Sequence, residues 1–162
     1  MLLRIMKKYK LTEETKEWCG HTLHRIEALK DFGNVKAGDK GGFIESEKNL
    51  SQEGSAWVSD SACVTGSARV SGLGRVSGSA WVSGSAWVTD SADYIVFKNW
   101  WSSDRYFTWT RSNNMWKVGC FYGTGEELIK KAYADSEKSG KEYERMVKYV
   151  ESILADEEKN EE

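Results

Sequence analysis

Alanine and valine recur with a period of six residues between Ala56 and Tyr94. Each hexad reads Ala-x-Val-Ser/Thr-Gly/Asp-Ser with few departures, and no residue is inserted between hexads. Such a repeat requires one backbone conformation copied many times. In an extended segment the Ala and Val side chains point to one side and the residue between them points to the other. The pattern therefore predicts a narrow apolar interior, too thin to hold a ligand, so that any binding must occur on the outside.

The segment before the repeat is predicted to contain a hairpin. Its strands would be Lys16–Trp18 and His21–Leu29, joined by a turn at Cys19 and Gly20. A helix over residues 22–30 is the alternative, because its apolar residues suit helical spacing equally well. We prefer the strand because the span between two glycines is short for a helix.

The repeat frame begins before the repeat becomes obvious. Ile44, Leu50 and Ala56 are six residues apart within a stretch rich in Gly, Lys, Asp and Glu. This spacing predicts a degenerate first coil that covers the open end of the repeat body.

After Ala92 the period changes from six to two. Strands are predicted over residues 93–101, 105–111 and 115–121, forming a three-stranded antiparallel sheet. Thr124-Gly125-Glu126-Glu127 has the form of a capping box and predicts a helix start, and residues 139–142 repeat that form. The second helix carries an apolar stripe that should pack on the sheet. The charged residues 156–162 are expected to be frayed.

Composition narrows the choice of compartment and partners. The formal net charge of −2 predicts neither bulk nucleic-acid binding nor attraction to an anionic membrane. The N-terminus lacks a signal-peptide core, and no segment is apolar enough to span a bilayer, so we expect a cytoplasmic protein. Three cysteines at unrelated spacings predict reduced thiols and no metal site. Eight tryptophans in a polar chain without proline indicate either burial or recognition.

The Val-x-x-x-Ala-x-Val spacing resembles the hexapeptide repeat of left-handed parallel β-helix proteins. More narrowly, the chain is similar to phage- and prophage-encoded β-helix proteins of uncertain role, on the evidence of residues 23–32, 38–42 and 119–124. The resemblance implies a triangular prism with three hexads per coil. The expected fold is mainly β: an N-terminal cap (1–34), a short left-handed parallel β-helix (35–94) and a C-terminal α+β module (95–162) with a three-stranded antiparallel sheet and two helices.

If three hexads form a coil, outward residues 18 positions apart stack on one face. The predicted pairs are Trp57 with Arg75, Cys63 with Trp81, and Arg69 with Trp87. Arginine beside tryptophan permits cation–π contacts worth about 0.5–2 kcal/mol each. Such pairs, with the outward Trp81 and Trp87 among them, have two interpretations. They either stack along the prism and stiffen it, or form platforms for a planar anion such as a nucleotide or for a partner subunit.

The C-terminal sheet offers a second set of candidates. One face must pack under the helices, which leaves some aromatic and arginine side chains outward as an interface or a pocket. Packing in a core or an oligomer contact is the alternative. The candidates are Trp101, Arg105, Tyr106, Arg111 and Trp116.

Many hexapeptide-repeat proteins are acyltransferases, and the resemblance makes this the enzyme class to test. Such enzymes use a histidine base, whereas His21 and His24, the only histidines here, both precede the repeat. Two histidines also fall short of a three-histidine zinc site. We therefore expect no catalytic residue, metal or cofactor.

The sequence thus favours a non-enzymatic binding protein that forms a homo-oligomer. From the phage resemblance, we hypothesise that it counters host antiviral defence in the host cytoplasm, either by sequestering a small anionic nucleotide signal or by binding a host protein. The alternatives are a hexapeptide-repeat acyltransferase, for which His24→Ala would be the test, and a structural assembly scaffold.

Overall fold

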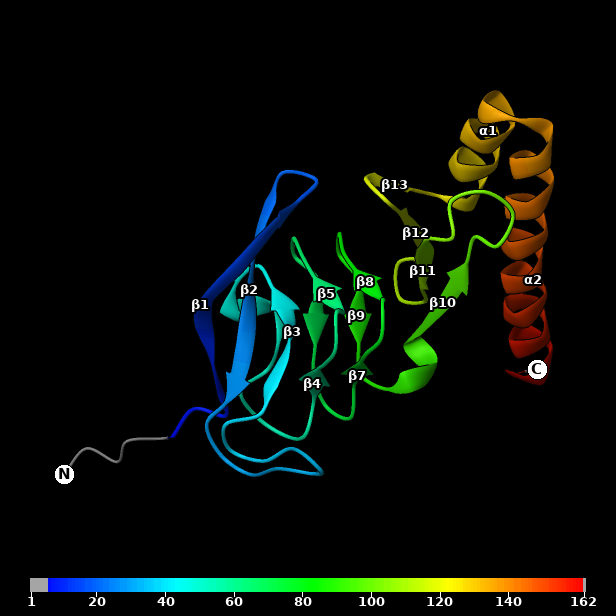
Figure 1. Cartoon of the computed structure of the whole chain (residues 1–162). Coiled ribbons are helices and arrows are strands. Elements are labelled where there is room, and N and C mark those ends of the chain that lie inside the picture. Colours follow the sequence, from blue (N-terminus) through cyan, green and yellow to red (C-terminus); the bar gives the residue numbers. More distant parts are fainter. Residues whose placement is uncertain (1–5, 162) are drawn as a thin grey trace.

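The computed structural model describes residues 6–161 of the chain. A hairpin, a stack of short parallel strands, an antiparallel sheet and two helices follow one another in chain order along the molecule (Figure 1). The chain is a mixture of β and α structure.

The N-terminal hairpin is confirmed, and the helical alternative for residues 22–30 is wrong. Strands β1 (Tyr9–Trp18) and β2 (His21–Ala28) pair antiparallel up to Trp18 and His21. Cys19 and Gly20 form the two-residue turn with φ of 52° and 82°. Two positive φ values are typical of the turn whose twist matches that of the strands, which explains why the chain reverses here.

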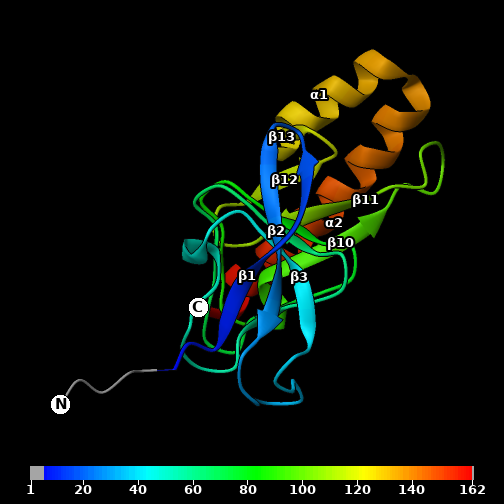
Figure 2. The same ribbon diagram turned by 60° about the vertical axis from the view of Figure 1, so that its left-hand side comes forward.

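Short parallel strands form the repeat body. β3 (Lys40–Ile44) pairs antiparallel with β2 and parallel with β5, so the hairpin continues one face of the body (Figure 2). The six strands of the hexads are β4 (Trp57–Val58), β5 (Cys63–Val64), β6 (Arg69–Val70), β7 (Arg75–Val76), β8 (Trp81–Val82) and β9 (Trp87–Val88).

Strand pairing follows the predicted 18-residue spacing. β4 pairs with β7, β5 with β8 and β6 with β9, always in parallel. A bridge between Leu50 and Val70, just after the 3-10 turn Glu47–Asn49, confirms an earlier, degenerate coil. Ile44 pairs with Val64 and Leu50 bridges to Val70, so both align with the Val positions of later hexads, and the prediction that Ala56 continues their six-residue frame is wrong. The left-handed sense of the coil stays a prediction.

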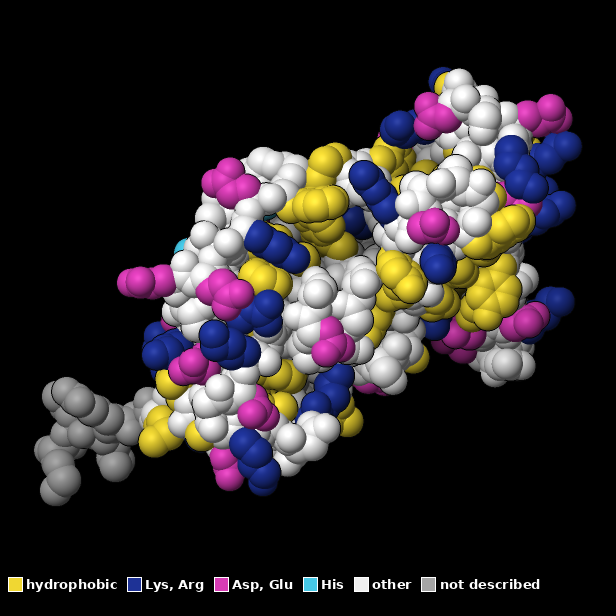
Figure 3. All heavy atoms as spheres, viewed as in Figure 1, with side chains coloured by type: hydrophobic (Ala, Val, Ile, Leu, Met, Phe, Trp, Pro, Cys, Tyr) yellow, Lys and Arg dark blue, Asp and Glu magenta, His cyan; other side chains and the backbone are white. Residues whose placement is uncertain are grey.

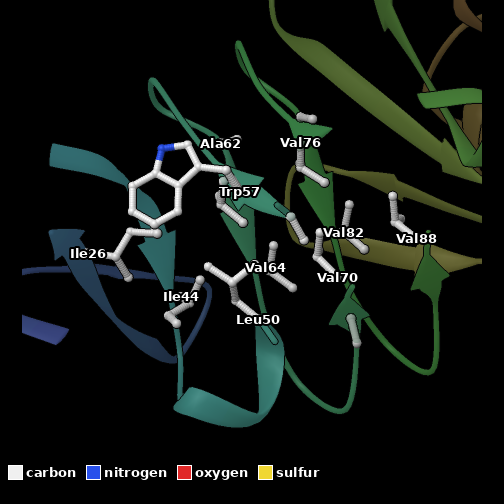
Figure 4. Packing of buried hydrophobic residues seen from close by; sticks show 14 of the residues in the cluster. Ile26, Ile44, Leu50, Trp57, Ala62, Val64, Val70, Val76, Val82 and Val88 are labelled. Carbon is white, nitrogen blue, oxygen red and sulfur yellow. The ribbon is translucent and has the colours of Figure 1, made fainter. Parts of the chain in front are cut away.

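The interior of the body is filled mainly by the small side chains of the hexads, and Ile26 of the hairpin and the Trp57 ring pack at its N-terminal end (Figure 4). The Val of every hexad is fully buried and the Ala is at most 1% exposed. Each buried Val contributes about 1.5–3 kcal/mol relative to an exposed one. Gly66, Gly72, Gly78 and Gly84 form corners with φ between 60° and 66°.

The C-terminal sheet has four strands rather than the predicted three. It comprises β10 (Tyr94–Lys98), β11 (Tyr106–Thr110), β12 (Met115–Val118) and β13 (Phe121–Gly123) in sequential antiparallel order. The predicted strand over 115–121 is divided because Gly119, with a φ of 56°, turns the chain.

Two helices cover one face of this sheet. α1 (Gly125–Asp135) begins at the predicted cap, where the Thr124 side chain accepts from the Glu127 N–H. α2 (Glu137–Glu161) begins two residues before Ser139, so the predicted start is wrong, and residues 156–161 are helical rather than frayed. Residue 162 of the predicted frayed tail lies outside the described residues. No helix within residues 6–161 is long and apolar enough to cross a membrane.

The other face of the sheet closes the end of the repeat body. Thr108 Oγ1 accepts from the Trp81 N–H at 2.9 Å, and Ser112 Oγ accepts from the Trp87 N–H at 2.7 Å. The Tyr94 hydroxyl donates to the Arg75 carbonyl at 2.9 Å. Polar side chains of the C-terminal module thereby satisfy the exposed edges of β7, β8 and β9, which would otherwise invite association.

Candidate functional site

A disulfide between Cys19 and Cys120 joins the β1–β2 turn to the β12–β13 turn, with 5.4 Å between the Cα atoms. The predicted reduced state is wrong for this pair, and Cys63 is the free cysteine. The two cysteines meet although they are far apart in the sequence, because the tips of the hairpin and of the C-terminal sheet both reach over the face formed by β5 and β8 (Figure 1). Within residues 6–161 no hydrogen bond or ion pair joins the hairpin directly to the C-terminal module.

Two hollows adjoin on the β5–β8 face, and we call them together the groove. The first, of about 280 Å³, has the outward residues Cys63 and Trp81 in its floor. The second lies at the disulfide and is lined by both bridged cysteines and by His21. Lys117 lines both hollows, so they are neighbours on this face. Figure 3 shows hydrophobic and basic side chains together in this region.

The first hollow, which we call the cationic end, combines aromatic rings with positive charge. Trp18 and Trp81 lie with ring centroids 5.9 Å apart at an angle of 59°. The Trp81 indole N–H donates to Thr65 Oγ1 at 2.9 Å, which fixes the ring. Lys117 Nζ lies 4.6 Å from the Trp81 ring centroid, and burial lowers the pKa of Lys117. Lys16 also lines this end.

Cys63 lies in the floor of the cationic end as a buried thiol. Burial raises the pKa of Cys63, against an opposing effect of nearby Lys16. The thiol form is therefore favoured, and Cys63 is unsuited to act as a nucleophile.

The second hollow, which we call the histidine end, is lined by His21, whose side chain contacts the Glu45 carboxylate. His21 Nδ1 lies 2.7 Å from Glu45 Oε2, while Glu45 Oε1 accepts from the Gly66 N–H at 2.7 Å. Burial raises the pKa of Glu45, but the hydrogen bonds from His21 and Gly66 outweigh it and bring that pKa below its ordinary value. An ionised Glu45 accepts a hydrogen bond from Nδ1–H, which leaves His21 Nε2 as the nitrogen able to take a proton.

His24 has a different environment. Its Nδ1 lies 3.3 Å from the Thr12 carbonyl across the hairpin, and it lines neither hollow of the groove. The structure therefore supports His21, and not His24, as the histidine to test for catalysis.

Three of the predicted site residues meet at the cationic end, namely Trp81, Arg105 and Tyr106. Two others are buried, contrary to the expected exposure. Trp57 is 4% exposed because Tyr9 and Phe32 pack edge-on against it. Trp116 is 1% exposed in the core under the helices.

The remaining candidates lie apart from the groove. Arg69 and Trp87 occupy the β6–β9 face, where Trp87 is exposed, and Arg75 Nη1 donates to Asn34. Among the described residues neither predicted Trp–Arg pair forms a cation–π contact.

Two candidates that were predicted at strand ends lie in turns just beyond β10 and β11, where they contact the long helix α2. The Trp101 indole N–H donates to Ser139 at 3.0 Å, and Arg111 pairs with Glu157 at 2.6 Å. Both residues therefore connect the sheet to the helix instead of facing the groove.

Sequence reasoning did not single out Glu45, which contacts His21, or several residues that line the groove: Lys16, Trp18, Cys120 and Lys117. One signal was available, because each bridged cysteine stands beside a glycine in a predicted turn or strand end. No group of residues able to hold a metal ion occurs within residues 6–161.

Comparison with known proteins gives one partial similarity. No family model matches the chain. A protein of Escherichia coli (strain K12) named as the uncharacterized acetyltransferase YdcK is 38% identical over 63 residues, which cover 34% of this chain and 19% of that protein. The chain thus matches less than a fifth of that protein's length. The comparisons give no support for a phage origin, and what they indicate is a distant, partial similarity to a protein named as an acetyltransferase.

Proposed function

We propose that the groove carries out acyl transfer from a thioester to an amine or hydroxyl acceptor, with His21 as the general base. The observation that carries the proposal is the His21–Glu45 pair, held at 2.7 Å beside the repeat body. A histidine oriented by a carboxylate is the arrangement that activates a nucleophile in acyl transfer. The partial similarity to a protein named as an acetyltransferase supports the same class.

The chemistry follows from the free nitrogen of His21. As the acceptor attacks the thioester carbonyl, its proton passes to Nε2, and the ionised Glu45 stabilises the resulting imidazolium. The carbon–sulfur bond then breaks, and the departing thiolate takes the proton from His21. Acyl product and free thiol are formed, and His21 returns to its starting state.

Single-residue variants test this role. Purified protein is incubated with acetyl-coenzyme A and a panel of amines and sugars, and acetylated product is measured by mass spectrometry. His21→Gln should lower the rate by about 100-fold or more, the usual contribution of a general base. Glu45→Gln should lower it less and shift the pH profile, since it removes only the orienting carboxylate.

His24→Gln is the matched control, because His24 lies outside the groove. It should keep the wild-type rate. Absence of any acetylated product across the panel, or equal rates for His21→Gln and wild type, would overturn the proposal.

A second candidate function is binding without turnover, favoured by the positive charge and aromatic rings at the cationic end. Under this hypothesis a ligand incubated with the protein is recovered intact and in stoichiometric amount after denaturation, whereas an enzyme returns product. The recovery experiment tests ligand binding alone. A role against host defence and a host protein as partner stay hypotheses.

A further inference from the structure

The cationic end of the groove contains three positive side chains without a negative partner. Lys16, Arg105 and Lys117 line it, and its lining includes no Asp or Glu. None of the three forms an ion pair within residues 6–161, although Lys7, Lys10 and other surface cations do. Convergent cations repel one another, and an anion placed between them removes that cost.

The buried cation makes this cost larger. Lys117 is 8% exposed and contacts the Trp81 ring, and burial lowers its pKa. A buried ammonium without a carboxylate is expensive unless a counter-charge or a neutral form relieves it. The Trp81 π face provides partial relief, and a bound anion would provide the rest.

The aromatic rings at the cationic end favour an anion that is attached to a planar group. Trp18 is 42% exposed and Trp81 is partly exposed, and their tilted planes leave ring surface open to the hollow. Tyr106 also lines the hollow and is 49% exposed. Rings of this kind bind planar bases by stacking, at about 1–3 kcal/mol per base.

The size of the hollow limits the ligand. A volume of about 280 Å³ is close to the lower limit of ligand pockets, which begin at about 300 Å³. It suits a nucleobase with adjacent phosphate, and a longer molecule would have to continue under the disulfide toward His21.

We propose that the cationic end binds the base and phosphates of a nucleotide, with Lys16 and Arg105 on the phosphates and Trp18 and Trp81 against the base. The inference rests on the groove being a ligand site, as proposed above, but not on the chemical step. It applies equally to a free nucleotide and to the nucleotide part of a thioester donor.

Calorimetric titration of the disulfide-intact protein tests the site, with ADP, adenosine and orthophosphate as separate probes. ADP should bind more tightly than either fragment, and its affinity should fall as salt rises, because exposed charges are screened. Quenching of tryptophan fluorescence should accompany ADP binding.

Arg105→Gln should weaken ADP binding by about tenfold, the loss expected for one charge-assisted phosphate contact. Arg69→Gln removes another exposed arginine, one on the β6–β9 face, and serves as the control, with unchanged affinity. Because both arginines are exposed, neither change should disturb folding. No heat with ADP at millimolar concentration, or equal weakening by the two variants, would overturn the inference.

The same set of measurements separates this inference from acyl transfer. ADP binding that persists in His21→Gln, together with no acetylated product from wild type, would refute acyl transfer alone. Acetyl transfer that proceeds while ADP neither binds nor inhibits would refute the nucleotide site alone.

Discussion

Removing the Cys19–Cys120 disulfide should strongly lower the free energy of unfolding. The bridge closes a chain segment with a sequence separation of 101 residues, from the N-terminal hairpin to the C-terminal sheet. In the loop-entropy treatment, closing a segment of that length stabilises the folded state by about 4.7 kcal/mol. This is a large part of the 5–15 kcal/mol typical of a whole domain.

Urea unfolding monitored by tryptophan fluorescence measures the effect, since the chain has eight tryptophans. The oxidised protein is compared with the same protein in excess dithiol and with a variant carrying both Cys19→Ser and Cys120→Ser. The last two should agree with each other and lie about 3–5 kcal/mol below the oxidised protein. Reductant should leave the double variant unchanged, which controls for effects on Cys63.

Thiol counting in denaturant verifies the starting state. The oxidised protein should show one reactive thiol, that of Cys63, and the reduced protein three. An unfolding free energy that differs by less than about 0.5 kcal/mol between the oxidised and reduced forms would refute the loop-entropy reasoning.

Three further predictions concern a corner, a buried lysine and an exposed face. Gly84→Ala should cost about 2 kcal/mol in thermal melts, because a Cβ would overlap the end of the Tyr122 side chain and that partly exposed ring would have to move. Gly78→Ala has the same left-handed φ but open space and should cost about 1 kcal/mol, so equal losses would contradict the role of Tyr122. Burial, followed by repulsion from nearby cations, lowers the pKa of Lys8 from 10.5 to about 8. The unfolded chain therefore binds more protons between these values, and the unfolding free energy should rise by about 1–2 kcal/mol from pH 8 to 10, a rise that Lys8→Met abolishes in urea titrations. Trp87 on the β6–β9 face is 56% exposed. If the expected homo-oligomer forms through this face, Trp87→Lys should lower the mass measured by light scattering, and an unchanged oligomer mass would exclude the face as the interface.

The repeat body could be predicted because its information is local and periodic. An even period places every Val on one side, and the 18-residue spacing then fixes which outward residues pair, as Trp57 does with Arg75. The capping box at Thr124 is equally local and located the first helix. Local signals also explain the errors: Gly119 divides a strand that alternation alone would continue.

The groove could not be predicted because distant segments build it. Alternation along the strand places Lys117 and Trp116 on opposite faces of the C-terminal sheet. The face that carries Lys117 is buried only because the sheet docks on the last coil of the repeat body, which no local pattern shows. Trp57 was expected outside because nothing local shows that Phe32 folds over it. Likewise His21 precedes the repeat in sequence, yet β2 continues a face of the body and brings it beside Gly66.

The disulfide also limits how many coils the body can contain. Each additional coil would move the hairpin away from the sheet by about 4.8 Å, the spacing of neighbouring strands. The Cα atoms of the bridged cysteines are 5.4 Å apart, and a disulfide tolerates no more than about 7 Å. Without the bridge, a gain or loss of 18 residues, one full coil, would keep the three faces in register. Here such a change would prevent the disulfide from forming. The bridge therefore fixes the number of coils between the hairpin and the sheet, and with it the width of the groove.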